Sequence, residues 1–263
     1  MSESLLYVLQ VECVGVVAGV ILNGVDVFAD WEGASRLVQT KVNPYIVEGP
    51  NALEVLVTPM TDDDGVPLPV ERMLRVALLR GPHGADPGPA GRIAGYTWDE
   101  AQSPVEPGVL TGVWGRQFTV SPEQAFGPWA WQLAPAVAPQ PDDAAALVQL
   151  AAEVHAALSA RDVRALLQLT RLRDAEMARA LDIPEAEYQT EQADYWAEWF
   201  GAPGFALDPF DPTALAAVPQ ARGRLVRVTD PYGGPPLQGG DGTRRFAFAF
   251  AACPVDGQWV IAR

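Results

Sequence analysis

The segment Val16-Val-Ala-Gly-Val-Ile-Leu-Asn-Gly-Val-Asp-Val-Phe-Ala-Asp-Trp31 consists of two short runs of apolar residues on either side of Asn23-Gly24. An Asn-Gly pair between two such runs is the strongest short signal for a β-hairpin, because both residues tolerate the positive φ angles of a two-residue turn. We therefore predict strands over Val16–Leu22 and Val25–Trp31, joined by a tight turn.

Runs of the same kind continue on both sides of this hairpin. They predict further strands at Leu5–Cys13, Ser35–Val42, Ala52–Thr58, Glu71–Leu79, Arg92–Trp98, Val109–Val120 and Pro128–Leu133. Turns are predicted at Thr61–Gly65 and in the Pro/Gly-rich segment Gly81–Gly91. Eight or nine short strands with frequent turns indicate an all-β sandwich over residues 1–133.

Two parts of this region carry a family resemblance. They are Val20-Ile-Leu-Asn-Gly-Val-Asp-Val27 and Val42-Asn-Pro-Tyr-Ile-Val-Glu-Gly-Pro-Asn-Ala-Leu-Glu-Val-Leu-Val57. The pattern resembles the galactose-binding-like jelly-roll domains that accompany many glycosidases, in which a strand ending in Leu-Asn-Gly precedes a Gly-x-Asn-x-Leu-x-Val-x-Val strand. The resemblance covers about 40 residues and implies a sandwich fold. It includes no sugar-contacting residue, so it does not imply sugar binding.

The second half has a different composition. Ala134–Pro141 contains three prolines and no charge, which predicts a linker, and residues 142–263 then form a second domain. Helical patterns follow from Asp142-Asp143 onward: one on the apolar face from Leu147 to Leu158, and others at Asp162–Leu172, Asp174–Leu181 and Glu185–Phe200. Asp182 is a candidate cap for the last of these helices, because Pro184 stands near its first turn.

The tail returns to strands at Arg222–Thr229, Arg244–Cys253 and Gln258–Ala262, with Pro231–Gly242 as a long glycine-rich connection. Helices followed by an antiparallel sheet predict an α+β domain, and the chain as a whole is α+β. The ending Asp256-Gly-Gln-Trp-Val-Ile-Ala-Arg263 resembles the last hairpin of nuclear-transport-factor-2-like cone folds. That resemblance implies a cone of helices on a curved sheet, although the helical part here is longer than is usual in that family.

The overall charge restricts the class of partner. With 33 acidic against 18 basic residues, the net charge of −15 argues against nucleic acid and against anionic membrane surfaces, and favours a cationic partner. The N-terminus has no basic segment ahead of an apolar one, so we expect no signal peptide and a cytoplasmic protein. Cys13 and Cys253 lie in apolar strand-like segments and are expected to be buried free thiols.

The most distinctive feature is the region between Arg179 and Arg222, which has eight carboxylates and no Lys or Arg. In the predicted helix, Glu187, Glu191, Asp194 and Glu198 follow a helical spacing, and Tyr188, Tyr195 and Trp199 follow the same spacing one position later. Like charges at this spacing repel, and aromatic residues are favoured in binding hot spots. The predicted partner-binding residues are Asp182, Glu185, Glu187, Tyr188, Glu191, Asp194, Tyr195, Glu198 and Trp199. The alternative is a solvated polar face with the aromatic residues packed inward.

Other candidate sites have weaker support. His155 could transfer protons with Asp162 or Asp194 if it pointed into a cone, but nothing in the sequence places these residues near each other, so a half-buried helix histidine is the better interpretation. Asp62-Asp63-Asp64 does not alternate ligands as a calcium loop does, so a charged turn is the better interpretation. The glycines of Pro231–Gly242 lack the lysine and the strand–helix context of a phosphate loop. No metal or cofactor is predicted.

The sequence therefore favours a non-catalytic binding protein for a basic protein partner. In size, acidity and layout it resembles the two-domain cytosolic immunity proteins that accompany type VI secretion effectors, which implies neutralisation of a toxin, most plausibly a nuclease with a positive cleft. The alternative is a small-molecule-binding or isomerase-like cone enzyme with an accessory sandwich. A carbohydrate-binding module is a third interpretation.

Overall fold

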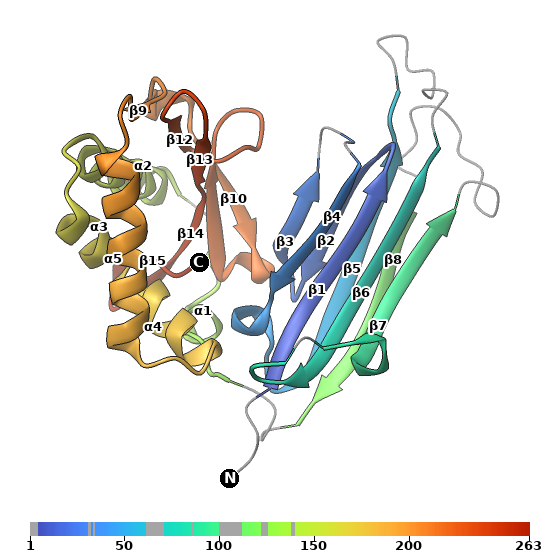
Figure 1. The fold of residues 1–263 in the computed structure, drawn as a ribbon. Helices are drawn as coiled ribbons and strands as arrows, with labels where there is room; N and C mark the ends of the chain where they lie inside the picture. Colours follow the sequence, from blue (N-terminus) through green and yellow to red (C-terminus); the bar gives the residue numbers. More distant parts are fainter. Residues whose placement is uncertain are drawn as a thin grey trace. The chain divides into compact units, whose positions relative to one another are not determined.

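The computed structural model describes residues 5–30, 33, 35–61, 71–85, 87–99, 112–121, 126–137 and 140–263 (Figure 1), with only the backbone for residues 112, 113, 141 and 142. The predicted turn at Asp62-Asp63-Asp64, Trp31 and the first residues of the predicted strand Val109–Val120 lie outside this set. The chain contains mixed helices and antiparallel sheets in two compact units, Met1–Gly127 and Pro128–Arg263.

In unit 1, the residues that the structure describes form two four-stranded antiparallel sheets. One has the order β4-β1-β6-β7, formed by Arg36–Lys41, Leu5–Val14, Met73–Pro82 and Arg92–Asp99. The other has the order β3-β2-β5-β8, formed by Val25–Asp30, Val16–Leu22, Gly49–Pro59 and Gly112–Val120. Alternate residues of both sheets, such as Leu9 and Val55, share one hydrophobic core. Two short 3₁₀ helices, Asn43–Tyr45 and Pro89–Gly91, lie between strands.

The β2–β3 hairpin forms as predicted. Asn23 and Gly24 have φ angles of 55° and 77°, as a two-residue hairpin turn requires. The Asn23 amide also donates to the side-chain oxygen of Asn51 at 2.8 Å, and the Asn51 amide donates to the carbonyl of Val47 at 2.8 Å. The two asparagines of the quoted pattern therefore join the hairpin to the turn before β5 by side-chain hydrogen bonds.

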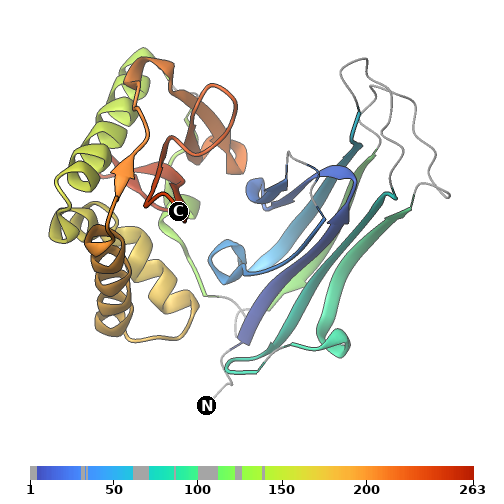
Figure 2. The same ribbon diagram turned by 45° about the horizontal axis from the view of Figure 1, so that its top comes forward.

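The described residues of unit 2 form five α-helices and two antiparallel sheets. The helices are α1 (Ala130–Leu133), α2 (Pro141–Ser159), α3 (Val163–Leu169), α4 (Arg171–Ala180) and α5 (Glu185–Gly201). The sheets have the orders β10-β11-β14-β15 (Ala216–Gln220, Leu225–Thr229, Phe250–Val255, Gln258–Ile261) and β13-β12-β9 (Arg245–Phe248, Leu237–Gly240, Ala206–Leu207). Helices α2, α3 and α5 share one hydrophobic core with these strands (Figure 2). Short 3₁₀ helices occur at Pro212–Ala214 and Ala221–Gly223.

Three predictions at the level of elements are wrong. Pro128–Leu133 is not the last strand of unit 1 but contains α1 and belongs to unit 2, where the Gln132 side chain accepts a hydrogen bond from the Trp129 backbone N–H at 2.8 Å. The predicted strand Arg244–Cys253 is two strands, β13 and β14, which pair with different neighbours. The predicted connection Pro231–Gly242 contains strand β12.

The glycines of β12 allow close packing of the strand. A Cβ on Gly239 would lie 2.5 Å from the carbonyl oxygen of Ala206 and 2.9 Å from the Phe246 ring. A Cβ on Gly240 would lie 2.3 Å from the carbonyl oxygen of Arg244. These residues lack side chains because neighbouring backbone occupies that space, so their glycine content signals tight packing in a strand.

Candidate functional site

Helix α5 carries the acidic and aromatic residues singled out in the sequence. It begins at Glu185 after Pro184, with Glu185 and Glu187 in its first turn, where carboxylates interact favourably with the helix dipole. Asp182 does not cap it: this residue has a φ of 52° and its N–H bonds to the carbonyl of Arg179, so it belongs to the turn after α4. Asp182 is exposed, but it lies before the helix.

Most aromatic residues of α5 point into the core of unit 2. Trp196, Trp199 and Phe200 are buried, and they contact the phenylalanines of β13 and the loop before β9. The ring centroids of Trp199 and Phe246 lie 5.2 Å apart. Trp199 is 7% exposed, so its main contacts are within the core and it offers little surface to a partner.

Four carboxylates form one exposed stripe along α5. Glu187, Glu191, Asp194 and Glu198 are all exposed and stand at i, i+4, i+7 and i+11, which places them on one face of the helix. We call these four residues the acidic stripe. Within the described residues, no ion pair or hydrogen bond engages the carboxylates of Glu187, Glu191 or Asp194. Glu185 is also exposed, and its side chain accepts a hydrogen bond from Gln189 at 3.0 Å.

Two tyrosines flank the acidic stripe. Tyr195 is 46% exposed and rests edge-on against the buried ring of Trp196, with ring centroids 5.1 Å apart. Tyr188 is half-buried; burial raises the pKa of its hydroxyl, an effect that the nearby Arg173 guanidinium partly opposes. Of the predicted aromatic contacts, Tyr195 is therefore the ring that offers the most surface beside the carboxylates.

The carboxylate of Glu198 already has a cationic partner, which the sequence interpretation missed. The Arg244 guanidinium donates to Glu198 at 2.6 Å and to Asp241 at 3.0 Å, and lies 4.6 Å from the centre of the Trp199 ring. These two carboxylates raise the pKa of Arg244, the Glu198 hydrogen bond contributing most. The backbone N–H of Arg244 and the Thr243 side chain donate to Asp241 and lower its pKa. One carboxylate of the acidic stripe, at its C-terminal end, is therefore paired with an arginine that lies outside the helix.

The geometry does not assemble the alternative proton-transfer site. The His155 ring is half-buried and stacks on Phe210, with centroids 4.7 Å apart. Asp162 caps α3 by accepting the Ala165 N–H at 3.0 Å. Asp194 is exposed on α5, and no hydrogen bond between described residues joins it or Asp162 to His155.

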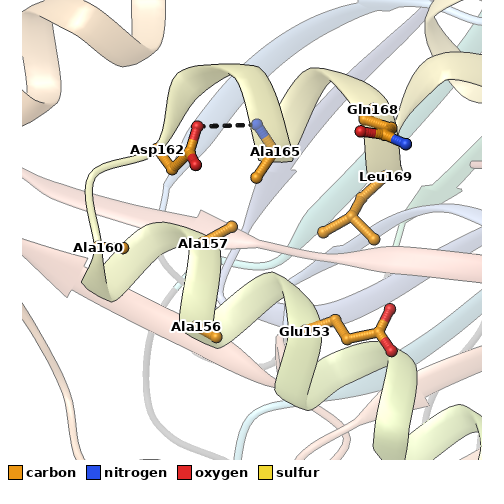
Figure 3. Close-up of a pocket in the computed structure, with 8 residues that line it drawn as sticks. All are labelled: Glu153, Ala156, Ala157, Ala160, Asp162, Ala165, Gln168 and Leu169. Atoms are coloured by element: carbon orange, nitrogen blue, oxygen red, sulfur yellow. Dashed lines mark hydrogen bonds between the residues drawn. The ribbon is translucent and has the colours of Figure 1, made fainter.

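A groove between α2 and α3 is a second surface feature, which was not predicted from the sequence. Its volume is about 440 Å³, and it is lined by Glu153, Ala156, Ala157, Ala160, Asp162, Ala165, Gln168 and Leu169 (Figure 3). We call it the alanine groove. The signal that could have revealed it is the i, i+4 spacing of Ala156 and Ala160 on one helix and of Ala165 and Leu169 on the next.

Cys13 and Cys253 are both buried thiols that form no disulfide between described residues, as predicted. Burial raises the pKa of Cys253 to about 11, and the nearby Glu176 carboxylate adds to this shift. No cluster of three or more His, Cys, Asp or Glu residues suited to a metal ion occurs in the described part of the chain. Among the helices of the same residues, none has the length and apolar character needed to cross a membrane.

Comparison of the chain with protein-family models, curated protein sequences and solved structures found no match in any of the three.

Proposed function

We propose that this chain is a non-catalytic binding protein that occludes a basic protein partner through the acidic stripe and Tyr195. The observation that carries the proposal is the exposure of Glu187, Glu191 and Asp194 on one helix face, where no cation among the described residues neutralises them. Like charges at i, i+4 cost roughly 0.2–0.5 kcal/mol per pair in the free protein. A cationic partner removes that repulsion, so relief of the repulsion within α5 contributes to the binding free energy.

The partner is a protein and not a small cation, because the stripe lies beside an aromatic anchor. Tyr195 is held from below by Trp196, so its ring is presented at little further cost in side-chain entropy. Complementary charge increases the rate of association, and a desolvated tyrosine slows dissociation. Substitutions of the carboxylates should therefore change mainly the association rate, and substitution of the tyrosine should change mainly the dissociation rate.

Within this class, we propose a cytoplasmic bacterial immunity protein that neutralises a secreted nuclease effector. A nuclease needs a positive cleft for nucleic acid, and an acidic surface with an aromatic anchor is complementary to such a cleft. The net charge of −15 supports this choice of partner. The proposal includes a galactose-binding-like sandwich for unit 1 and a nuclear-transport-factor-2-like fold for unit 2.

The test uses the product of the gene immediately upstream in the native genome, purified and titrated against the chain at low and high salt. The variant Glu187→Gln/Glu191→Gln/Asp194→Asn removes three negative charges from the stripe. The expected loss of affinity is on the order of 10-fold to 100-fold at low salt, because an exposed ion pair contributes up to about 1 kcal/mol. The effect should shrink at high salt, where such pairs are screened.

A matched control separates the effect of the stripe from the effect of overall charge. Glu48→Gln/Glu71→Gln/Asp256→Asn changes the net charge by the same amount at other exposed positions and should leave affinity nearly unchanged.

Tyr195→Ala should increase the dissociation rate about tenfold or more. Tyr232→Ala, at a tyrosine that is 93% exposed outside the stripe, should not. Equal losses from the stripe variant and its charge control would show that α5 is not the binding face. A neutral or acidic upstream product that does not bind would refute the proposed partner.

A further inference from the structure

The alanine groove has the shape of a helix-binding site. Its walls are the last two turns of α2 and most of α3, and Figure 3 shows Ala156, Ala157 and Ala165 between Asp162 at one end and Glu153, Gln168 and Leu169 at the other. Ala156 and Ala160 are exposed, so the groove floor faces solvent. Small residues spaced i, i+4 leave a depression between neighbouring helix ridges, into which the side chains of another helix can pack.

The backbone around the groove indicates that its occupant is a helix and not an extended segment. Both walls are α-helices, whose N–H and C=O groups are bonded internally, so the groove has no free strand edge to which a β-strand could add. The turn between the walls is fixed by Arg161, which has a φ of 55° and donates to the carbonyls of Phe200 and Phe205 at 2.8 and 3.3 Å. The groove is therefore already formed in the free protein.

The charges around the groove determine the chemistry of its occupant. Among the described residues that line it, two are ionisable, Glu153 and Asp162, and both are exposed. The Asp162 carboxylate accepts one N–H at the start of α3, which leaves further acceptor capacity. The nearest cation in sequence, Arg161, directs its guanidinium to the carbonyls at the end of α5 and not into the groove. Both ends of the groove thus attract positive charge.

We infer that the alanine groove binds an amphipathic helix of a protein partner that carries a basic residue at each end of a short apolar face. Ala160, beside Asp162, follows Glu153 by seven residues of helix, which corresponds to about 10 Å along the axis. The occupant therefore has Lys or Arg at i and i+7, with Leu-sized residues at i+3 and i+4 over the alanines. This surface is distinct from the acidic stripe and does not depend on the function proposed for it.

The experiment uses a fluorescein-labelled, end-capped 15-residue Ala/Gln host peptide with Arg at i and i+7 and Leu at i+3 and i+4. Binding to the full chain is measured by fluorescence anisotropy at low salt, and backbone NMR shifts locate the site. Ala156→Trp fills the groove and should weaken binding about tenfold or more. Asp162→Asn keeps a residue that caps a helix well while removing the charge, and should weaken binding about threefold in a salt-dependent way.

Matched controls distinguish this site from other surfaces. Ala145→Trp places the same side chain at another exposed alanine of α2, outside the groove, and should leave binding unchanged. A peptide with Arg at i and i+4 should bind more weakly than the i, i+7 peptide. Far-UV circular dichroism establishes that each variant is folded.

The inference is overturned if the i, i+7 peptide does not bind, or if Ala156→Trp and Ala145→Trp have the same effect. It is also overturned if the stripe variant Glu187→Gln/Glu191→Gln/Asp194→Asn abolishes binding while Ala156→Trp does not. The last result would place the peptide on α5 and support the function proposed for the acidic stripe instead.

Discussion

Replacing Glu176 should destabilise unit 2 more than any exposed substitution, because Glu176 neutralises a buried arginine. The Arg263 side chain is 3% exposed and donates to Glu176 at 2.5 Å. The other carboxylate oxygen of Glu176 accepts the backbone N–H of Ala130 at 2.7 Å and lies 3.6 Å from Arg179. One side chain therefore links α4, α1 and the C-terminal strand segment.

The expected loss of stability depends on whether the substitution leaves a charge buried without its ion-pair partner. In Glu176→Leu the Arg263 guanidinium stays buried without its carboxylate, and breaking a buried ion pair in this way typically costs about 3–5 kcal/mol. Replacing both partners, as in Glu176→Leu/Arg263→Met, removes the desolvated charges together and is often close to neutral. The double variant should therefore be more stable than the single variant, although it contains more changes.

Urea denaturation followed by circular dichroism at 222 nm measures this directly, since the α-helices of the described chain all lie in unit 2. With a slope of about 2 kcal/mol per molar urea, the single variant should lower the midpoint by roughly 1.5–2.5 M. Glu153→Leu, the same substitution at an exposed helix position, should change stability by about 0.5 kcal/mol or less. The reasoning would be refuted if Glu176→Leu lowered the free energy of unfolding by less than about 1 kcal/mol, or if the double variant were less stable than the single variant.

Three further predictions address the thiol, the glycine strand and the stripe. The pKa of Cys253 is raised from 9.0 to about 11, so the stabilising contribution of the protonated thiol is fully present below pH 9 and is lost between about pH 9 and 11. The free energy of unfolding should fall by roughly 2–3 kcal/mol across that range. In urea titrations, the free energy of unfolding of Cys253→Ala should depend less steeply on pH over the same range. Gly239→Ala should lower the free energy of unfolding by about 1–3 kcal/mol in thermal melting, because its Cβ would lie 2.5 Å from a backbone oxygen. The control Gly201→Ala has open space around the new Cβ, so it should be neutral or slightly stabilising. Arg244→Gln should leave the thermal midpoint nearly unchanged, because its ion pair with Glu198 is exposed. It should increase affinity for the basic partner in titration calorimetry, and unchanged or weaker binding would contradict the role given to the stripe.

Local signals in the sequence predicted the local structure well. Asn23-Gly24 located the first hairpin, because the turn conformation is fixed by these two residue types. The periodicity from Glu187 to Glu198 located α5 and its exposed carboxylates, because the spacing of a helix face depends only on the helix itself.

Features that depend on residues distant in sequence could not be predicted in this way. Arg244 is 46 residues from Glu198, so the neutralisation of one end of the stripe follows from the position of β13 beside α5 and not from either sequence segment. Strand β12 was missed because glycine usually indicates a turn, and its actual role is set by the proximity of Ala206 and Phe246. Trp199 was placed on the binding face because a period alone does not show which side of a helix the core covers.

The hydrogen bonds from Arg161 to the carbonyls of Phe200 and Phe205 give α5 unequal ends. The last turn of α5 is hydrogen-bonded to Arg161 in the α2–α3 turn. The rings of Trp196, Trp199 and Phe200 also anchor this last turn of α5 in the core. Its first turn has no side-chain cap and begins with exposed residues. The backbone at Glu185 and Glu187 is therefore less constrained than at Phe200, so the carboxylates of the first turn can adjust to an approaching surface while Tyr195, against Trp196, keeps its place.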